Sequence, residues 1–189
     1  YAPLEKAWVP VTGDNYFYIY CLWVSGSYKG KGYGKELLQS CIDDAKAQGK
    51  SGICLLSSKK KKPFLSEKKF MLKYGFKVVD TINDEYELLA LSFDGTQPQF
   101  TSNVRKQSIE GKELTIYYGV QCPYIPNCIE QIYNYCENNQ IPLRLVEIDT
   151  LEKAKQLPCI FNNWAVFYNG KFETVHLLNE GLLKKLLLR

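Results

Sequence analysis

The sequence contains a single histidine among its 189 residues, and no apolar run approaches the ~18–20 residues of a membrane-spanning helix. His176 has no cluster of cysteine, histidine or aspartate near it in the sequence, so neither a metal site nor a Ser-His-Asp arrangement is supported. We therefore expect no metal cofactor and no membrane partner.

The seven cysteines are an odd number and are scattered through stretches that resemble strand and helix interiors. A secreted disulfide framework more often has an even number of cysteines clustered in loops. We therefore expect reduced thiols and a cytoplasmic protein, with Cys21 and Cys54 buried as packing residues.

The formal net charge of +4 is concentrated in residues 59–77, where eight lysines face one acid, Glu67. Lysines in such a run are usually exposed to solvent on the protein surface. The more specific alternative is that they bind a phosphate-rich ligand. Few aromatic residues interleave with these lysines for base stacking, so we expect no nucleic-acid partner.

The hydrophobic pattern predicts an α/β (α+β) protein with two units. In the first, residues 1–94, β-branched and aromatic runs alternate with helical spacing. Residues 95–113 are rich in Gly, Pro, Gln, Ser and Thr, so we expect a linker there and a second domain over residues 114–189. The predicted elements of the first unit are a strand over 16–24, a helix from Lys35 to Gly49, a strand over 52–58, a helix from Pro63 to Gly75, and strands over 76–81 and 86–93.

The second unit shows a similar alternation. It ends in a hairpin across Asn169-Gly170, a strong two-residue turn signal, followed by an amphipathic helix. The predicted elements are a strand over 114–118, a helix over 127–139, a strand over 143–148, a short helix over 151–156, hairpin strands over 164–168 and 172–177, and a helix over 180–188.

The turn Lys29-Gly30-Lys31-Gly32-Tyr33-Gly34 joins the first strand to the first helix. Glycines allow positive φ and close backbone approach to a ligand. A helix N-terminus adds unpaired N–H groups and a partial positive charge. Together these features predict an anion site suited to a pyrophosphate.

Two familiar phosphate loops do not fit this turn. A P-loop requires Ser or Thr after Gly-Lys, and Gly34-Lys35 is followed by Glu36. The dinucleotide fingerprint would need a third glycine at position 35 or 37, occupied here by Lys and Leu. What remains is Arg/Gln-x-x-Gly-x-Gly/Ala, with Lys in the first position; a tight turn without a ligand is the alternative.

Leu22-x-Val24, followed by this loop, resembles the coenzyme A signature of the GCN5-related N-acetyltransferase (GNAT) family. Gly75-Phe76 resembles the second landmark of that family. The phrases Tyr1-Ala-Pro, Cys21-Leu-Trp-Val and Ser58-Lys-Lys-Lys-Lys-Pro-Phe-Leu-Ser resemble a subgroup that carries a C-terminal YoaP domain. The resemblance runs over almost the whole chain and implies a partial GNAT-type mixed sheet followed by a thioredoxin-like domain.

The resemblance also implies acetyl-coenzyme A as substrate and an amine, of a small molecule or a protein, as acceptor. The residues before the loop would hold the thioester carbonyl and pantetheine arm, and loop amides would bind the pyrophosphate. Lys59–Lys62 could reach the 3′-phosphate. The implied coenzyme-binding residues are Leu22, Trp23, Val24, Lys29, Gly30, Lys31, Gly32, Tyr33, Gly34, Lys35 and Ser58.

Catalytic groups are harder to assign. Family members often place a Tyr four residues before the helix-ending Gly, where this chain has Met71. Tyr20 is a candidate acid or base, although an aromatic residue on a strand is more often part of the core. The chain starts at Tyr1 without Met, so we expect acceptor-binding elements to precede it in a longer chain.

The predicted order of elements in the second unit resembles a thioredoxin-like fold, with Cys122-Pro123-Tyr124 at its first strand-to-helix junction. Ile125 follows, so no vicinal disulfide can form, but Cys122 could act as a lone reactive thiol. Leu157-Pro158 suits a cis peptide bond. The alternative function is a thiol-dependent redox or adaptor protein whose first domain binds coenzyme A without efficient catalysis.

Overall fold

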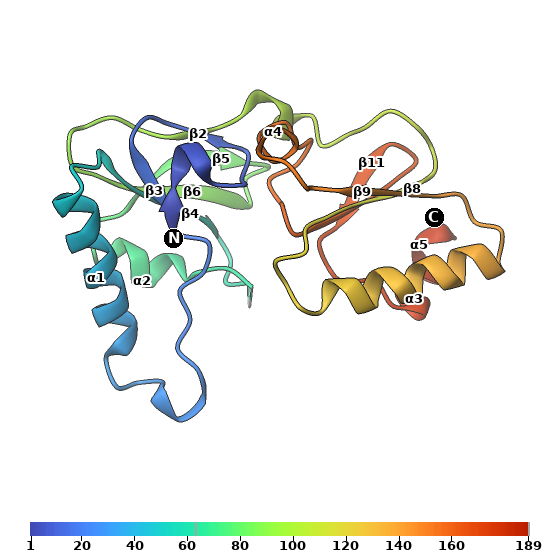
Figure 1. Cartoon of the computed structure of the whole chain (residues 1–189), viewed down its shortest axis with the longest axis horizontal. Coiled ribbons are helices and arrows are strands. Elements are labelled where there is room, and N and C mark those ends of the chain that lie inside the picture. Colours follow the sequence, from blue (N-terminus) through green and yellow to red (C-terminus); the bar gives the residue numbers. More distant parts are fainter. Residues whose placement is uncertain (63, 189) are drawn as a thin grey trace. The chain divides into compact units, whose positions relative to one another are not determined.

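The computed structural model describes residues 1–62 and 64–188 and contains two compact units (Figure 1). The first consists of Tyr1–Ala7 and Val11–Phe100, and the second of Trp8–Pro10 and the chain from Thr101 onward. Within the expected linker lie the short strand β7 (Gln99–Phe100) and the 3-10 helix η3 (Ser102–Arg105). No helix in the described part is long and apolar enough to cross a membrane.

The first unit is built on a five-stranded mixed sheet with the order β1-β3-β4-β6-β5. Strands β3 and β4 are parallel, and the other neighbours are antiparallel, so the expected mixed α/β fold is confirmed. A separate pair, β2 and β7, is antiparallel. The strands are β1 (Ala2–Pro3), β2 (Val11–Thr12), β3 (Tyr16–Tyr18), β4 (Gly52–Ser58), β5 (Lys77–Ile82), β6 (Tyr86–Ser92) and β7 (Gln99–Phe100).

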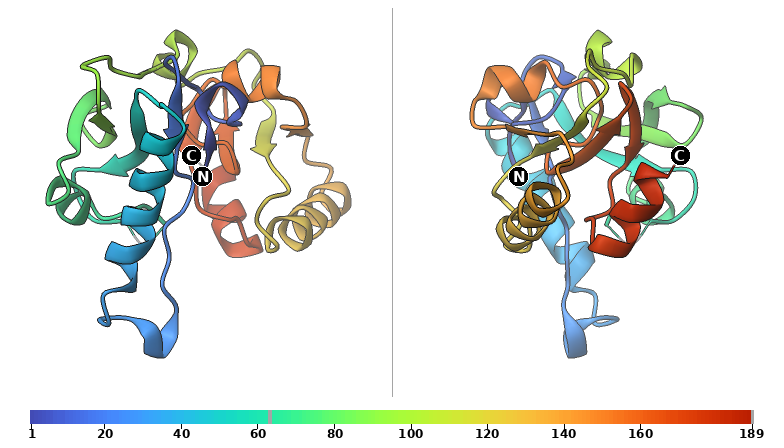
Figure 2. Two further views of the ribbon diagram at one scale, coloured as in Figure 1. Left: turned by 60° about the vertical axis from the view of Figure 1, so that its left-hand side comes forward. Right: turned by 90° about the vertical axis from the view of Figure 1, so that its right-hand side faces the viewer.

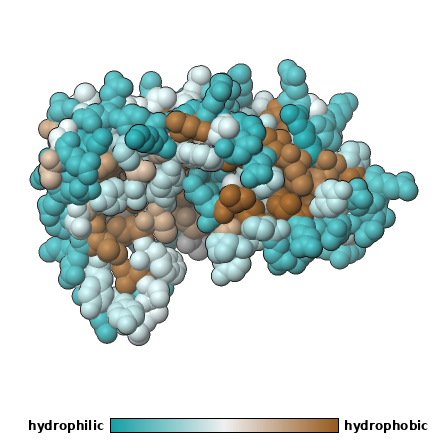
Figure 3. All heavy atoms as spheres, viewed as in Figure 1, coloured by the Kyte–Doolittle hydropathy of each residue, from teal (hydrophilic) through white to brown (hydrophobic). Residues whose placement is uncertain are grey.

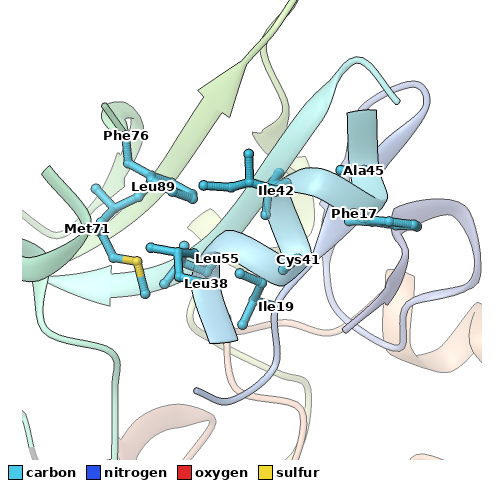
Figure 4. Close-up of a cluster of buried hydrophobic side chains, with 11 residues drawn as sticks. Phe17, Ile19, Leu38, Cys41, Ile42, Ala45, Leu55, Met71, Phe76 and Leu89 are labelled. Carbon is cyan, nitrogen blue, oxygen red and sulfur yellow. The ribbon is translucent and has the colours of Figure 1, made fainter. Parts of the chain in front are cut away.

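Helix α1 (Tyr33–Ala47) covers one face of this sheet. Its buried residues Leu38, Cys41, Ile42 and Ala45 recur at the spacing of a single helical stripe. They join Met71 of α2 (Lys68–Leu72) and several strand residues in one hydrophobic cluster, so α1 and α2 pack on the same face (Figure 4).

Helix α2 spans only Lys68–Leu72, so the prediction of a helix from position 63 is wrong in its length. Pro63 itself lies outside the described residues. The N–H of Leu65 closes a turn on the carbonyl of Lys62, and the hydroxyl of Ser57 donates to the carbonyl of Ser66 at 2.9 Å. These contacts engage backbone groups that a longer helix would need.

Strand β3 is also shorter than predicted, because it ends at Tyr18 rather than at position 24. The last hydrogen bond to β4 runs from the N–H of Ile19 to the carbonyl of Cys54, at 2.9 Å. Beyond it β4 continues to Ser58 against β6, while the chain after Ile19 leaves the sheet. Figures 1 and 2 show the segment between β3 and α1 as a long excursion.

The second unit has a four-stranded sheet with the order β11-β10-β8-β9, in which β8 and β9 are parallel and the other neighbours antiparallel. Helices α3 and α5 lie side by side (Figure 2). Both contribute to one cluster over this sheet. The elements are β8 (Leu114–Tyr118), α3 (Ile125–Asn138), β9 (Leu143–Glu147), α4 (Leu151–Lys155), β10 (Trp164–Tyr168), β11 (Lys171–Thr174) and α5 (Glu180–Leu187).

Local signals explain the ends of several of these elements. Asn169 and Gly170 have φ of 51° and 75°, so the predicted tight hairpin turn is confirmed. The side chains of Thr150 and Asn179 cap α4 and α5. All described peptide bonds are trans, so the expectation of a cis bond before Pro158 is wrong. The thioredoxin-like description stays a prediction.

Leu38 and its neighbour Leu37 provide a test of the packing of α1. Leu38 is fully buried, whereas Leu37 is half exposed. We expect Leu38→Ala to lower the free energy of unfolding by ~2–5 kcal/mol, because it leaves a cavity in the core. Leu37→Ala should change it by about 0.5 kcal/mol or less. Urea denaturation measures both, and equal losses would contradict this packing.

Candidate functional site

The glycine-rich turn before α1 has left-handed backbone conformations at two of its glycines. A 3-10 turn, η2 (Gly26–Tyr28), ends the excursion, and Gly30 and Gly32 follow with φ of 77° and 91°. Gly32 is the N-cap, so α1 begins at Tyr33, two residues before the predicted start. Side chains with a Cβ rarely adopt such φ, which explains both glycines.

The space beside these glycines is open. A Cβ added at Gly30 or Gly32 would meet no atom within 4 Å, and one at Gly34 would only touch Phe70 at 3.8 Å. The carbonyl of Gly32 accepts from the N–H groups of Lys35 and Glu36. The turn thus offers room in front of a 15-residue helix N-terminus, and the residues present fit a bound pyrophosphate.

A groove of about 510 Å³ borders the turn on the outer side of α1. Its walls are largely aromatic or apolar, and Trp23 and Tyr28 are about 60% exposed. Figure 3 shows hydrophobic residues beside the excursion. The lining residues are Trp23, Val24, Ser25, Tyr28, Tyr33, Glu36, Leu37 and Ser40.

Two lysines of the turn lie over these aromatic rings. Lys29 Nζ is 4.7 Å from the centre of the Trp23 ring, and Lys31 Nζ is 5.6 Å from that of Tyr28. These contacts hold the two ammonium groups near the N-terminus of α1. The lysine charges and the partial positive charge of the helix N-terminus would both attract an anion bound there. The structure therefore brings together Trp23 and Lys29, two of the residues predicted to bind the coenzyme.

The lysines after β4 are held differently. Lys59, Lys61 and Lys62 form ion pairs with Asp84, Glu67 and Glu85 at 3.0, 3.0 and 2.6 Å. The hydrogen bond from Lys61 holds the pKa of the Glu67 carboxyl below its usual range. These pairs would have to exchange before the lysines could bind a phosphate.

The remaining predicted residues lie where β3 leaves β4. Leu22 packs against the core cluster, and Tyr20 is about one-third exposed with its ring edge-on to Tyr18 at 5.2 Å. Burial raises the pKa of Tyr18. Ser58, the last residue of β4, is buried and donates its hydroxyl to the carbonyl of Lys60 at 2.7 Å.

Met71, in place of the expected tyrosine, is fully buried in the core cluster and offers no proton. Sequence reasoning overlooked two further residues. Tyr28 lines the groove directly before the lysines, and Glu87 is a buried carboxylate in β6. The sequence feature that could have identified Glu87 is an acidic residue within a predicted strand whose neighbouring residues are mostly apolar.

In the second unit, Cys122 lies in the turn before α3, where its carbonyl accepts from the N–H of Ile125 at 3.1 Å. It is half-buried, and Cys128 is buried with its thiol near the carbonyl of Leu178. His176 is exposed and follows β11. Among the described residues no group of three or more His, Cys, Asp or Glu could hold a metal ion.

Comparison with known proteins divides the chain in a similar way. Residues 2–76 match the model of the acetyltransferase (GNAT) family, and residues 142–185 match the YoaP-like family. A protein of Bacillus subtilis (strain 168), named uncharacterized N-acetyltransferase YoaP, is 39% identical over 189 residues. The alignment covers 99% of this chain and 75% of that protein. No solved structure matches the chain.

Thiol reactivity tests the placement of the cysteines. The expectation that Cys21 is buried is wrong, since it is exposed after the chain leaves the sheet. We expect Cys21 and Cys122 to react first with a disulfide reagent. Burial raises the pKa of Cys41 to about 11 and that of Cys159 to about 12, so these should react slowly.

Mass mapping after brief labelling identifies the first modified cysteines. Early modification of Cys128 or Cys136, both buried, would mean that α3 is misplaced.

Proposed function

This chain belongs to the GNAT family of acetyltransferases, and we propose that it transfers an acetyl group from acetyl-coenzyme A to an amine of an acceptor. The GNAT and YoaP-like regions and the 39% identity to a protein named as an N-acetyltransferase support this proposal. The observation that carries it is the turn into α1, with two left-handed glycines and open space before a long helix.

The residues that would hold the coenzyme act mainly through their backbone. Of the amides from Lys29 to Lys35, the N–H groups of Lys29 and Lys35 already donate to the carbonyls of Gly26 and Gly32. The amides between them are proposed to bind the pyrophosphate, and the side chains of Lys29 and Lys31 supply positive charge. Leu22, Trp23 and Val24 would hold the pantetheine arm, because their backbone has left β4 and is available for hydrogen bonds. Ser58 is proposed to line the same region from β4.

When bound, acetyl-coenzyme A would supply the thioester. The chain's part is to orient that group and to exclude water, with backbone N–H groups near its carbonyl. Tyr20, two residues after β3, remains a proposed acid or base. Met71 contributes only packing, so we expect the departing thiolate to receive its proton from another residue or from water.

The thiol-dependent redox or adaptor function is not favoured by the family membership. Cys122 is a single half-buried thiol with Ile125 three residues later, so the chain offers no vicinal dithiol there. The sheet order of the second unit is compatible with the predicted thioredoxin-like fold. We propose that this unit assists the acetyltransferase rather than catalysing thiol exchange.

Coenzyme A should stabilise the protein. At 100 times its dissociation constant the stabilisation is ~2.7 kcal/mol, or several degrees in the melting temperature. Gly32→Glu should abolish the shift, because it strains the left-handed N-cap and brings a carboxylate to the proposed pyrophosphate position. Thermal melts with and without coenzyme A measure the effect.

Gly49→Glu is the matched control. Gly49 also has positive φ, 63°, and no atom within 4 Å of an added Cβ, but it follows the C-terminal end of the same helix. The same strain and charge there should leave the coenzyme shift intact. If both variants keep the shift, or both lose it, the loop assignment is wrong.

The proton that the thiolate needs can be tested at position 71. Met71→Tyr would introduce a hydroxyl where family members often carry one, and Met71→Phe adds similar bulk without it. A positioned acid contributes about 10²–10⁴ in rate. We therefore expect a higher kcat for Met71→Tyr than for Met71→Phe, measured by thiol release with saturating acetyl-coenzyme A. Equal rates would place position 71 away from the reacting atoms.

A further inference from the structure

Glu87 is a carboxylate buried inside β6, with only 4% of its side chain exposed. It is followed by the apolar residues Leu88, Leu89 and Ala90. A charge removed from water needs partners for its oxygens, since desolvation is otherwise unfavourable. Its surroundings therefore indicate what this position binds.

Only one of the two oxygens has a partner in the described part of the chain. Lys68 Nζ donates to Oε1 at 2.7 Å, whereas Oε2 is buried and accepts no hydrogen bond. Ser57 lies opposite on β4, but its hydroxyl donates to the carbonyl of Ser66. A buried unpaired oxygen is costly, which points to a donor from outside the chain.

Register places Glu87 next to the proposed coenzyme site. Leu55 pairs with Leu89, and two residues further along Ser57 pairs with Glu87. Because side chains alternate, Glu87 continues the face on which Leu55, Leu89 and Met71 form the core cluster. The β3–β4 pairing has already ended at Cys54. Glu87 thus lies beside the part of β4 that β3 has left.

Lys68, the ion-pair partner of this carboxylate, reaches solvent. It is the first residue of α2, and 27% of its side chain is exposed. Its position shows that a primary ammonium fits against Glu87. An ammonium has three N–H donors, and charge-assisted hydrogen bonds to a carboxylate are stronger than neutral ones.

We propose that Glu87 binds the ammonium group of the acyl acceptor through Oε2, so that the preferred acceptor is a primary alkylamine. Lysine side chains and the ends of polyamines belong to this class. An aromatic amine, which is uncharged at neutral pH, gains nothing from the carboxylate. The ammonium of Lys68 competes with the acceptor for the Glu87 carboxylate, so removing Lys68 should strengthen binding of the acceptor. The proposal rests on the proposed acetyl transfer.

Steady-state kinetics of the full chain with 1,5-diaminopentane and with aniline test the proposal at saturating acetyl-coenzyme A. Glu87→Gln should raise the KM for the diamine by about 10–100-fold, with little change in kcat and none for aniline. Lys68→Met should act in the opposite direction and lower the diamine KM. A merely structural ion pair would make both single variants worse for both amines.

Two further variants serve as controls. Glu85 lies two residues before Glu87 in the sequence, and its exposed carboxylate pairs with Lys62. Glu85→Gln removes that carboxylate and should leave the diamine KM unchanged. If Glu87→Gln alone folds poorly, the double variant Glu87→Gln with Lys68→Met removes both charges together and should show the same raised KM.

An unchanged diamine KM in the folded Glu87 variants, or equal losses for the diamine and aniline, overturns the assignment of Glu87. Wild-type protein that acetylates neither amine nor a panel of lysine-containing peptides, although coenzyme A still raises its melting temperature, instead refutes the acetyl transfer on which the assignment rests. The wild-type assay thus separates the two failures.

Discussion

The hydrogen bond from the N–H of Ile19 to the carbonyl of Cys54 is the last one between β3 and β4, and the candidate site depends on where it falls. Before this bond β3 and β4 are paired as parallel strands. Beyond it β4 continues to Ser58 and pairs with β6, whereas the segment that follows β3 no longer pairs with β4. A released backbone can bind a ligand, because its N–H and C=O groups are no longer used within the sheet. The excursion, the glycine turn and α1 all follow from this separation.

The glycine turn is the part of the released chain that is proposed to bind an anion. Gly30 and Gly32 reverse the backbone with positive φ, and the free space beside them lies in front of α1. Lys29 and Lys31 hold their charge over aromatic rings nearby. Glu87 of β6 pairs with Ser57, in the part of β4 that lies beyond the last hydrogen bond to β3. The proposed site thus combines a turn suited to the phosphates of the donor with a carboxylate suited to the ammonium of the acceptor.

Elements bounded by local signals could be predicted from the sequence, whereas those set by partners could not. The strand over 52–58 is an apolar run between turn residues, and its bounds agree with β4. The strand over 16–24 was predicted too long, since aromatic content does not tell where a neighbouring strand stops pairing. The helix from position 63 followed a local proline preference that the turn before α2 overrides. Glu87 is visible as a charged residue in a strand, but its unpaired oxygen depends on non-local packing.

Amide hydrogen exchange with and without coenzyme A tests the central claim most directly, because it reports on the backbone groups that are proposed to bind. The chain carries an internal comparison: α1 begins behind two left-handed glycines, whereas α3 begins with proline in its first turn. On coenzyme binding we expect slower exchange in residues 20–24 and 29–36 and no change at the start of α3. Protection at the start of α3 without protection in residues 29–36 would contradict this claim.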